Sequence, residues 1–294
     1  WDKMIATIKS ILLQEGVYYE IVIADDCSDD FNRKKIDEFF KYNNFFRYKI
    51  IHLMENKGTV SNVYNALNYC DGSYVKFISP GDMLFDKYSL RDMYNFALKW
   101  NAEIVFGDAV YYNNKNGIKC VRTYNHPVYM QPYKDDEQEK IEFFNIVMGD
   151  GVTGATLLAN KRVIKKYIEP LLGKVRYLED YFVKLAILDG VFIKYLSRNV
   201  LWYEFGDGGI STSKSNEWKK ALLLDEGNAN RIIVEYAILK NKFYTKYLEH
   251  KKNKYFYLKY FKTLIGKFQM LFDRSYSRIE EDISFVEQCF GQGN

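Results

Sequence analysis

The distribution of apolar residues predicts alternating helices and strands over the first part of the chain. Residues 2–14 carry apolar side chains every three or four positions, as an amphipathic helix does, and residues 19–26 form an apolar run that ends in two acids. The pattern continues with a helix over 32–42, a strand over 48–54, a helix after the 56–58 turn, a strand over 74–78, a helix over 87–100 and a strand over 102–112. This alternation predicts an α/β fold with a mostly parallel central sheet between helices.

The acids that follow the predicted strands point to one edge of that sheet. Asp25 and Asp26 end one strand, residues 79–82 (SPGD) follow another, and Asp108 lies near the end of a third. Open sheets of this class bind ligands beyond the carboxyl ends of their strands. We therefore expect these residues to share one rim and to mark the functional site.

The pattern is less regular after residue 112. A helix entered by Glu179 and Asp180 and a strand over 191–197 are expected, and helical periodicity dominates from Asn216 onward. We place a boundary at Lys214, with one domain over 1–214 and a helical C-terminal region over 215–294.

Composition narrows the class of protein. The chain has 294 residues, 48% of them hydrophobic, and its net charge of +4 is too small to indicate nucleic-acid binding. The four cysteines are scattered without zinc-site spacing, and no apolar run reaches membrane-spanning length, so we expect a cytoplasmic protein with reduced thiols. Because a helical pattern starts directly at Trp1, we also expect residues to be missing upstream.

Five segments resemble, in order, those of the family-2 glycosyltransferases that build bacterial surface glycans. They are SILLQ (10–14), IVIADDCSDD (21–30), ENKGTVSNVYNAL (55–67), GSYVKFISPGD (72–82) and YLEDYFVKLAILDG (177–190). The resemblance implies a GT-A-type nucleotide-diphospho-sugar transferase fold. It also implies inverting transfer of a sugar, most simply from a UDP-sugar, to a hydroxyl of a surface-glycan or lipid-linked acceptor. The family's first strand lies upstream of SILLQ and would be absent here.

By this resemblance, Asp25 and Asp26 bind the nucleotide. A carboxylate accepts hydrogen bonds from a base N–H or from ribose hydroxyls, which suits the role. Alternatively, one of the two caps the helix that follows.

The same resemblance makes Asp82 the candidate metal ligand. Where the family usually has Asp-x-Asp, this chain reads Ser79-Pro80-Gly81, so the use of Mg²⁺ or Mn²⁺ is an open question. Mg²⁺ takes one or two protein carboxylates together with phosphate oxygens, so Asp82 alone could suffice. Alternatively, Asp82 caps the turn into the next helix.

A Gly- and Ser-rich stretch after Glu204 is the candidate for binding the diphosphate. Its backbone N–H groups, hydroxyls and one ammonium suit an anion. The residues concerned are Gly208, Gly209, Ser211, Ser213 and Lys214. The alternative is a flexible linker into the helical region.

Glu179 and Asp180 match the family's acid pair, which implies that Asp180 is the catalytic base and that Glu179 orients donor or acceptor. Inverting transfer needs one base within reach of the acceptor hydroxyl. Acids in the first turn also complement a helix dipole, which is the structural alternative.

The stretch that starts at Lys251 and ends at Phe272 mixes basic and aromatic residues at helical spacing. It predicts either a helix on the cytoplasmic face of a membrane or one that packs on the domain or on a second subunit. The overall alternative to an enzyme is a non-catalytic partner or carbohydrate-binding subunit of the same fold.

Overall fold

The computed structural model describes residues 1–115, 117–121, 127–206, 215–245, 264 and 283–291. Its elements are, up to residue 120, α1 (Asp2–Leu12), β1 (Ile21–Asp25), α2 (Arg33–Tyr42), β2 (Tyr48–His52), α3 (Thr59–Ala66), β3 (Tyr74–Val75), β4 (Met83–Leu84), α4 (Ser89–Trp100), β5 (Ile104–Asn113) and β6 (Lys119–Cys120). They continue with α5 (Gln131–Lys134), α6 (Gln138–Ile146), η1 (Gly154–Thr156), β7 (Leu157–Asn160), α7 (Lys161–Ile168), η2 (Glu169–Leu171), η3 (Glu179–Tyr181), α8 (Phe182–Leu188), β8 (Ile193–Glu204), α9 (Asn216–Leu239) and α12 (Ile283–Phe290).

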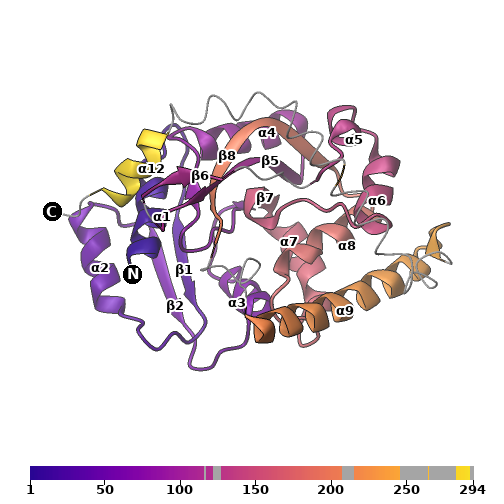
Figure 1. Cartoon of the computed structure of the whole chain (residues 1–294), viewed down its shortest axis with the longest axis horizontal. Helices are drawn as coiled ribbons and strands as arrows, with labels where there is room; N and C mark the ends of the chain where they lie inside the picture. The colour runs from indigo at the N-terminus through magenta and orange to yellow at the C-terminus, as the bar shows by residue number, and fades with distance from the viewer. Residues whose placement is uncertain (116, 122–126, 207–214, 246–263, 265–282, 292–294) are drawn as a thin grey trace.

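Two sheets organise these elements (Figure 1). β1 and β2 form a parallel pair, with Ile21 opposite Tyr48. The larger sheet has the order β3-β7-β5-β8-β4, and β6 pairs with the end of β5. β5 and β8 run parallel to each other, and their register shifts on both sides of Asp108.

The α/β architecture agrees with the sequence, but the strand pairing differs from the mostly parallel sheet that was expected. Among the described strands, only the β1–β2 and β5–β8 ladders are parallel, and the ladders that involve β3, β4, β6 and β7 are antiparallel. The reason is chain order. β7 enters between β3 and β5 after the excursion through α5 and α6, so strand–helix alternation does not set its direction.

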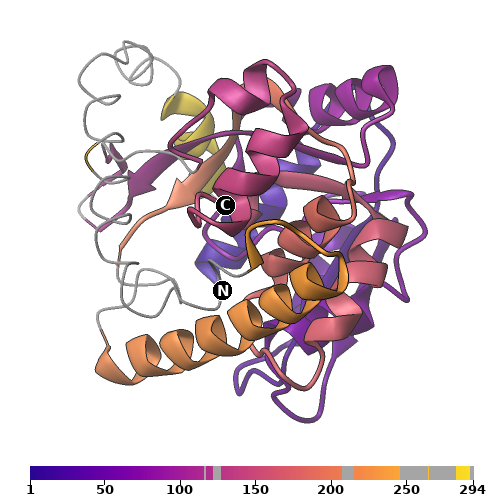
Figure 2. The same cartoon turned by 90° about the vertical axis from the view of Figure 1, so that its right-hand side faces the viewer.

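The central strand β5 explains where the helices pack. Ile104 and Phe106 belong to a core shared with α6, α7, α8 and α9, whereas Val105 packs in a cluster with Ala97 of α4. Successive side chains of a strand point to opposite faces, so this one strand supports helices on both sides. Figure 2 shows α9, in orange, crossing the near side of the molecule.

The described helices after residue 214 both pack on the preceding part of the chain. Ala229 and Ile232 of α9 are buried in the same core as α8. α12 lies along α1 (Figure 1), and its Val286 and Cys289 are buried in one cluster with Trp202. The boundary predicted at Lys214 falls outside the described residues and stays a prediction.

The surface helix predicted between Lys251 and Phe272 also lies outside the described residues, except for Leu264. In the part of the chain that the structure describes, no helix combines the length and the apolar character needed to cross a bilayer.

Candidate active site

Asp25 lies at the end of β1, beside His52 at the end of β2. Its Oδ2 accepts hydrogen bonds from the backbone N–H of Ser28 at 2.9 Å and from Nδ1 of His52 at 2.8 Å. The His52 ring in turn stacks on Phe31, with ring centroids 4.3 Å apart. Partial burial acts to raise the pKa of Asp25, but the bonds from Ser28 and His52 outweigh it and hold this pKa below its usual value. Asp25 is thus a fixed anion at the edge of the small sheet.

Asp26 caps the turn that leads into α3. Its two carboxylate oxygens accept the backbone N–H groups of Lys57 at 2.8 Å and of Gly58 at 2.7 Å. Gly58 has φ +85°, a conformation that favours glycine. The helix that directly follows the two acids is capped by another residue, because the side chain of Asn32 accepts the N–H of Lys35 at the start of α2.

Asp82 is buried, with 5% of its surface exposed, just before β4. Its Oδ1 accepts the backbone N–H of Glu204 at 3.0 Å, and its carboxylate caps no helix, since α4 begins later, at Ser89. Burial raises the pKa of Asp82 to about 7, against the opposing effects of the Glu204 N–H and the Lys76 ammonium. Burial likewise lowers the pKa of Lys76 to about 7, with Asp82 acting in the opposite direction. The charges of the two groups therefore act on each other.

Hydroxyl groups of α1 hold the turn before Asp82 in place. Thr7 Oγ1 donates to the carbonyl of Asp82 at 2.7 Å and accepts the N–H of Gly81 at 3.0 Å. Ser10 Oγ accepts the N–H of Leu84 at 3.1 Å. The first helix therefore fixes the backbone from which the Asp82 side chain projects.

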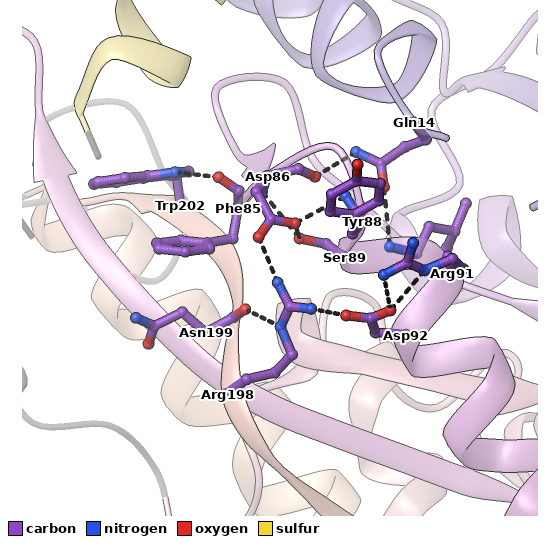
Figure 3. A network of polar contacts seen from close by, with 11 residues as sticks. Gln14, Phe85, Asp86, Tyr88, Ser89, Arg91, Asp92, Arg198, Asn199 and Trp202 are labelled. Carbon is purple, nitrogen blue, oxygen red and sulfur yellow. Dashed lines mark hydrogen bonds and ion pairs between the residues drawn. The ribbon is translucent and has the colours of Figure 1, made fainter. Parts of the chain in front are cut away.

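Gln14 and Arg198 fix the loop that follows β4 (Figure 3). Gln14 Nε2 donates to the carbonyl of Asp86 at 2.7 Å, and its Oε1 accepts a backbone N–H in the first turn of α4 at 2.9 Å. Arg198 of β8 forms ion pairs with both Asp86 and Asp92. These contacts tie α1, the loop and β8 together behind the turn that carries Asp82.

The carboxylate of Glu204 fills the space that a side chain at position 81 would take. A Cβ built on Gly81 would lie 2.3 Å from Oε2 of Glu204, and Gly81 has φ +104°. The Lys3 ammonium lies 2.7 Å from the same oxygen. Asp82 and Glu204 are thus two carboxylates that could hold a divalent cation, which is the number that Mg²⁺ takes when phosphate oxygens complete its shell. Within the described residues, no group of three or more His, Cys, Asp or Glu side chains could hold a metal.

Glu179 and Asp180 lie half-buried in η3, the turn that opens into α8. Asp180 packs against Gly154, where an added Cβ would lie 2.6 Å from the Asp180 Cβ. Desolvation and the neighbouring Asp180 raise the pKa of Glu179 to about 8. Desolvation also raises the pKa of Asp180, while the Lys184 ammonium opposes the shift. A carboxylate with a raised pKa is suited to general-base catalysis near neutral pH.

The segments that carry Asp82 and Asp180 meet through Lys76. The Lys76 ammonium, whose pKa responds to the charge of Asp82, donates to the carbonyl of Ala155 at 2.6 Å. Ala155 directly follows Gly154, which touches Asp180. The half-buried Lys76 is therefore bonded beside Gly154 and acts electrostatically on Asp82.

The segments that carry Asp26 and Asp180 meet through Arg176. Its guanidinium donates to the carbonyl of Asn56 at 2.9 Å, in the turn that Asp26 caps, and its carbonyl accepts the N–H of Val60 at 3.1 Å. Through these contacts the structure links the segments that carry Asp26, Asp82 and Asp180.

Of the remaining predicted residues, the structure describes only Asp108. Asp108 lies within β5 rather than at a strand end, and its carboxylate accepts the hydroxyl of Tyr195 at 2.6 Å, so its expected place on the rim is not observed. The predicted diphosphate residues lie outside the described residues and stay a prediction; they are Gly208, Gly209, Ser211, Ser213 and Lys214.

The family model for glycosyl transferase family 2 matches residues 1–157, which is more than half of the chain. The chain belongs to glycosyl transferase family 2. The protein is therefore a nucleotide-sugar-dependent glycosyltransferase, and its GT-A-type fold agrees with the expectation from the sequence motifs.

Curated relatives of this transferase include two bacterial glycosyltransferases. It is 24% identical, over 73% of its own length and 77% of the relative's, to UDP-Glc:alpha-D-GlcNAc-diphosphoundecaprenol beta-1,3-glucosyltransferase WfgD of Escherichia coli. It is 32% identical to poly(ribitol-phosphate) beta-N-acetylglucosaminyltransferase TarP of Staphylococcus aureus (strain N315), over 36% of this chain and 32% of that relative. Among solved structures, residues 1–349 of S. aureus TarS in complex with UDP-GlcNAc give a TM-score of 0.50 at 17% identity, covering 80% of this chain and 69% of that one. The structural likeness supports the fold.

Several contributors to the transferase's site were not singled out from its sequence. His52, Lys76, Arg176 and Glu204 carry no local pattern that marks them. The only available signal was the position of Glu204 at the start of the Gly-rich stretch. Each of these residues acts through a contact with a residue far away in the chain, which single-sequence patterns do not encode.

Proposed function

We propose that the transferase moves a sugar from a UDP-sugar to a hydroxyl of a surface-glycan or lipid-linked saccharide acceptor, with inversion at the anomeric carbon. The names of the relatives support this choice, since WfgD uses UDP-Glc and a diphosphoundecaprenol-linked acceptor and TarP acts on poly(ribitol-phosphate). Both names specify beta products, whereas the sugar of UDP-Glc is alpha-linked. The observation that carries the proposal is the half-buried Glu179–Asp180 pair against Gly154 in a family-2 chain.

In the proposed reaction, Asp180 accepts the proton of the acceptor hydroxyl while the acceptor oxygen attacks the anomeric carbon. The bond between that carbon and the diphosphate oxygen breaks, and its electron pair leaves with the diphosphate. The raised pKa of Asp180 makes it a stronger base than an exposed aspartate. Burial and the neighbouring Asp180 raise the pKa of Glu179 and so favour its protonated form, which can donate a hydrogen bond to a sugar hydroxyl.

Asp25 and Asp26 are proposed to bind the base or ribose of the donor. Each already accepts two hydrogen bonds from the protein, but an ionised carboxylate has about four acceptor sites, so each retains capacity for a ligand donor. These internal bonds orient the carboxylates before the nucleotide arrives, which lowers the entropy lost on binding.

A divalent cation, which many reactions of this class use to balance the diphosphate charge, would be held by Asp82 together with Glu204. Gly81 leaves room for the Glu204 carboxylate, so the missing acid of the Asp-x-Asp pattern is matched by one from β8. The 208–214 residues would contribute hydroxyls and the Lys214 ammonium to the same diphosphate. Three further expectations remain predictions: a membrane contact made by the segment from Lys251 to Phe272, a homodimer and a cytoplasmic location.

The test is a donor screen for hydrolysis and transfer with purified protein, run with and without EDTA, together with the Asp180→Asn variant. We expect turnover of UDP-Glc or UDP-GlcNAc to fall about 10²- to 10⁴-fold in Asp180→Asn, with binding of UDP retained. Asp135→Asn, which changes an exposed aspartate near α5, is the matched control. Wild-type protein that binds UDP but turns over no donor would instead favour the non-catalytic partner.

A further inference from the structure

We propose that Asp225 of α9 is a positioning residue for Asp180, because it fixes the backbone at Arg176 and Tyr177 from which the acid pair is presented. The inference rests on the proposed function, in which Asp180 is the base. It assigns a catalytic contribution to a helix that the sequence pattern places outside the transferase domain.

Asp225 holds two consecutive backbone N–H groups with its carboxylate. The residue is buried, with 6% of its surface exposed. Both of its carboxylate oxygens accept the N–H of Arg176, each at 2.9 Å, and its Oδ2 also accepts the N–H of Tyr177 at 2.6 Å. A second contact supports the first, because the ring of Trp218, at the start of α9, meets that of Tyr177 edge-on at 5.1 Å. α9 thus holds two consecutive peptide units.

The segment that Asp225 holds, Arg176 and Tyr177, belongs to no helix or strand. It lies between the turns after η2 and the start of η3, so tertiary contacts alone set its position. On the side away from α9, Arg176 bonds to Asn56 and its carbonyl accepts the N–H of Val60. A Cβ on Gly58 would lie only 2.2 Å from the Arg176 Cγ, so this side offers no room for the segment to move inward. The segment is therefore held between α9 and the turn that Asp26 caps.

The consequence for catalysis follows from the short distance along the chain. Asp180 lies three residues after Tyr177, at the start of the turn that opens α8. A misplacement of a reacting group by about 1 Å can cost about 10²-fold in rate.

The test compares Asp225→Asn with wild type in two backgrounds, the natural one and Asp180→Asn. An amide keeps the size of the side chain but loses its charge and one acceptor oxygen. We expect kcat to fall about 10- to 100-fold while Kd for UDP changes less than about twofold. In the Asp180→Asn background the same change should cost no further activity, because the group being positioned is already absent. The acid limb of the kcat–pH profile should shift in Asp225→Asn, and Glu235→Gln, also on α9, should leave both quantities unchanged.

An unchanged kcat in folded Asp225→Asn would overturn the inference, as would an equal loss in both backgrounds or a loss that follows the affinity for UDP. If Asp225→Asn does not fold, Trp218→Leu takes its place, since it loosens the same segment without removing a buried charge. Failure of the proposed function is distinguishable, because Asp180→Asn alone would then retain wild-type turnover.

Discussion

The tight packing of Gly154 against Asp180 allows the placement of the base to be disturbed without removing it. In Gly154→Ala the new methyl group would stand 2.6 Å from the Asp180 Cβ and 2.9 Å from its Oδ2. Carbon atoms in contact prefer a separation of at least about 3.5 Å, so the two groups must move apart by about 1 Å. A displacement of this size is expected to lower kcat about 10²-fold, and overpacking costs about 1–3 kcal/mol of stability.

Three measurements on Gly154→Ala separate these effects. Turnover of the UDP-sugar gives kcat, calorimetric titration gives Kd for UDP, and a urea transition gives the free energy of unfolding. We expect a large loss in kcat, an unchanged Kd and a moderate loss in stability. Gly227→Ala is the matched control, because a Cβ at that helical position meets nothing within 4 Å. This control should keep full activity and gain up to about 1 kcal/mol from the better helix propensity of alanine.

A folded Gly154→Ala protein with nearly wild-type kcat would contradict the role assigned to the contact between Gly154 and Asp180. That result would mean either that Asp180 relaxes without consequence or that it is not the reacting base. A loss of UDP affinity equal to the loss in kcat would also count against it, because the displaced group is proposed to act on the acceptor hydroxyl and not on the nucleotide.

Three further outcomes follow from the site. Gln14→Ala leaves a carbonyl and an N–H near α4 without their partner and should destabilise the protein by about 2–4 kcal/mol, read from urea transitions. The pKa of Glu179 is raised from its usual value near 4.5 to about 8, so its contribution to stability is complete below pH 4.5 and is lost as the pH rises through 8. Glu179→Gln should therefore gain stability relative to wild type between pH 5 and pH 8 in paired urea transitions, and a constant difference would contradict the assigned shift. Finally, Mn²⁺ should raise the Tm of the UDP complex of wild type, with reversal by EDTA, but not that of Glu204→Gln; an equal rise in both would exclude Glu204 as a ligand.

The regular elements were predictable because their signals are local. The apolar spacing over residues 2–14 and the run before Asp25 correspond to α1 and β1 within a few residues. Glu179 and Asp180 were expected at the entry to a helix and lie in η3, which opens into α8. In each case, the periodicity of a helix or strand and the polar residues at its end are properties of neighbouring residues.

The strand pairing and the second carboxylate depend instead on contacts between distant parts of the chain. The sequence around β7 does not say that it inserts between β3 and β5 in reverse direction. Similarly, the sequence at Gly81 indicated only that an acid was missing. Glu204 lies 123 positions later in the chain, and its carboxylate reaches the space beside Gly81 because β8 ends next to that turn. The resemblance of SILLQ to family-2 sequences was visible in the sequence. The contacts of Ser10 and Gln14 with the backbone around β4 were not, because they depend on the fold.

The packing of α12 on α1 bears on how this transferase can be shortened. Val286 and Cys289 fill the layer behind Tyr112, and the Tyr112 hydroxyl donates to the carbonyl of Gly81 in the turn before Asp82. A truncated protein that stops after β8 would therefore lack part of the wall that supports the turn that carries Asp82. Any minimal catalytic fragment has to retain this last helix or replace the apolar surface that it covers.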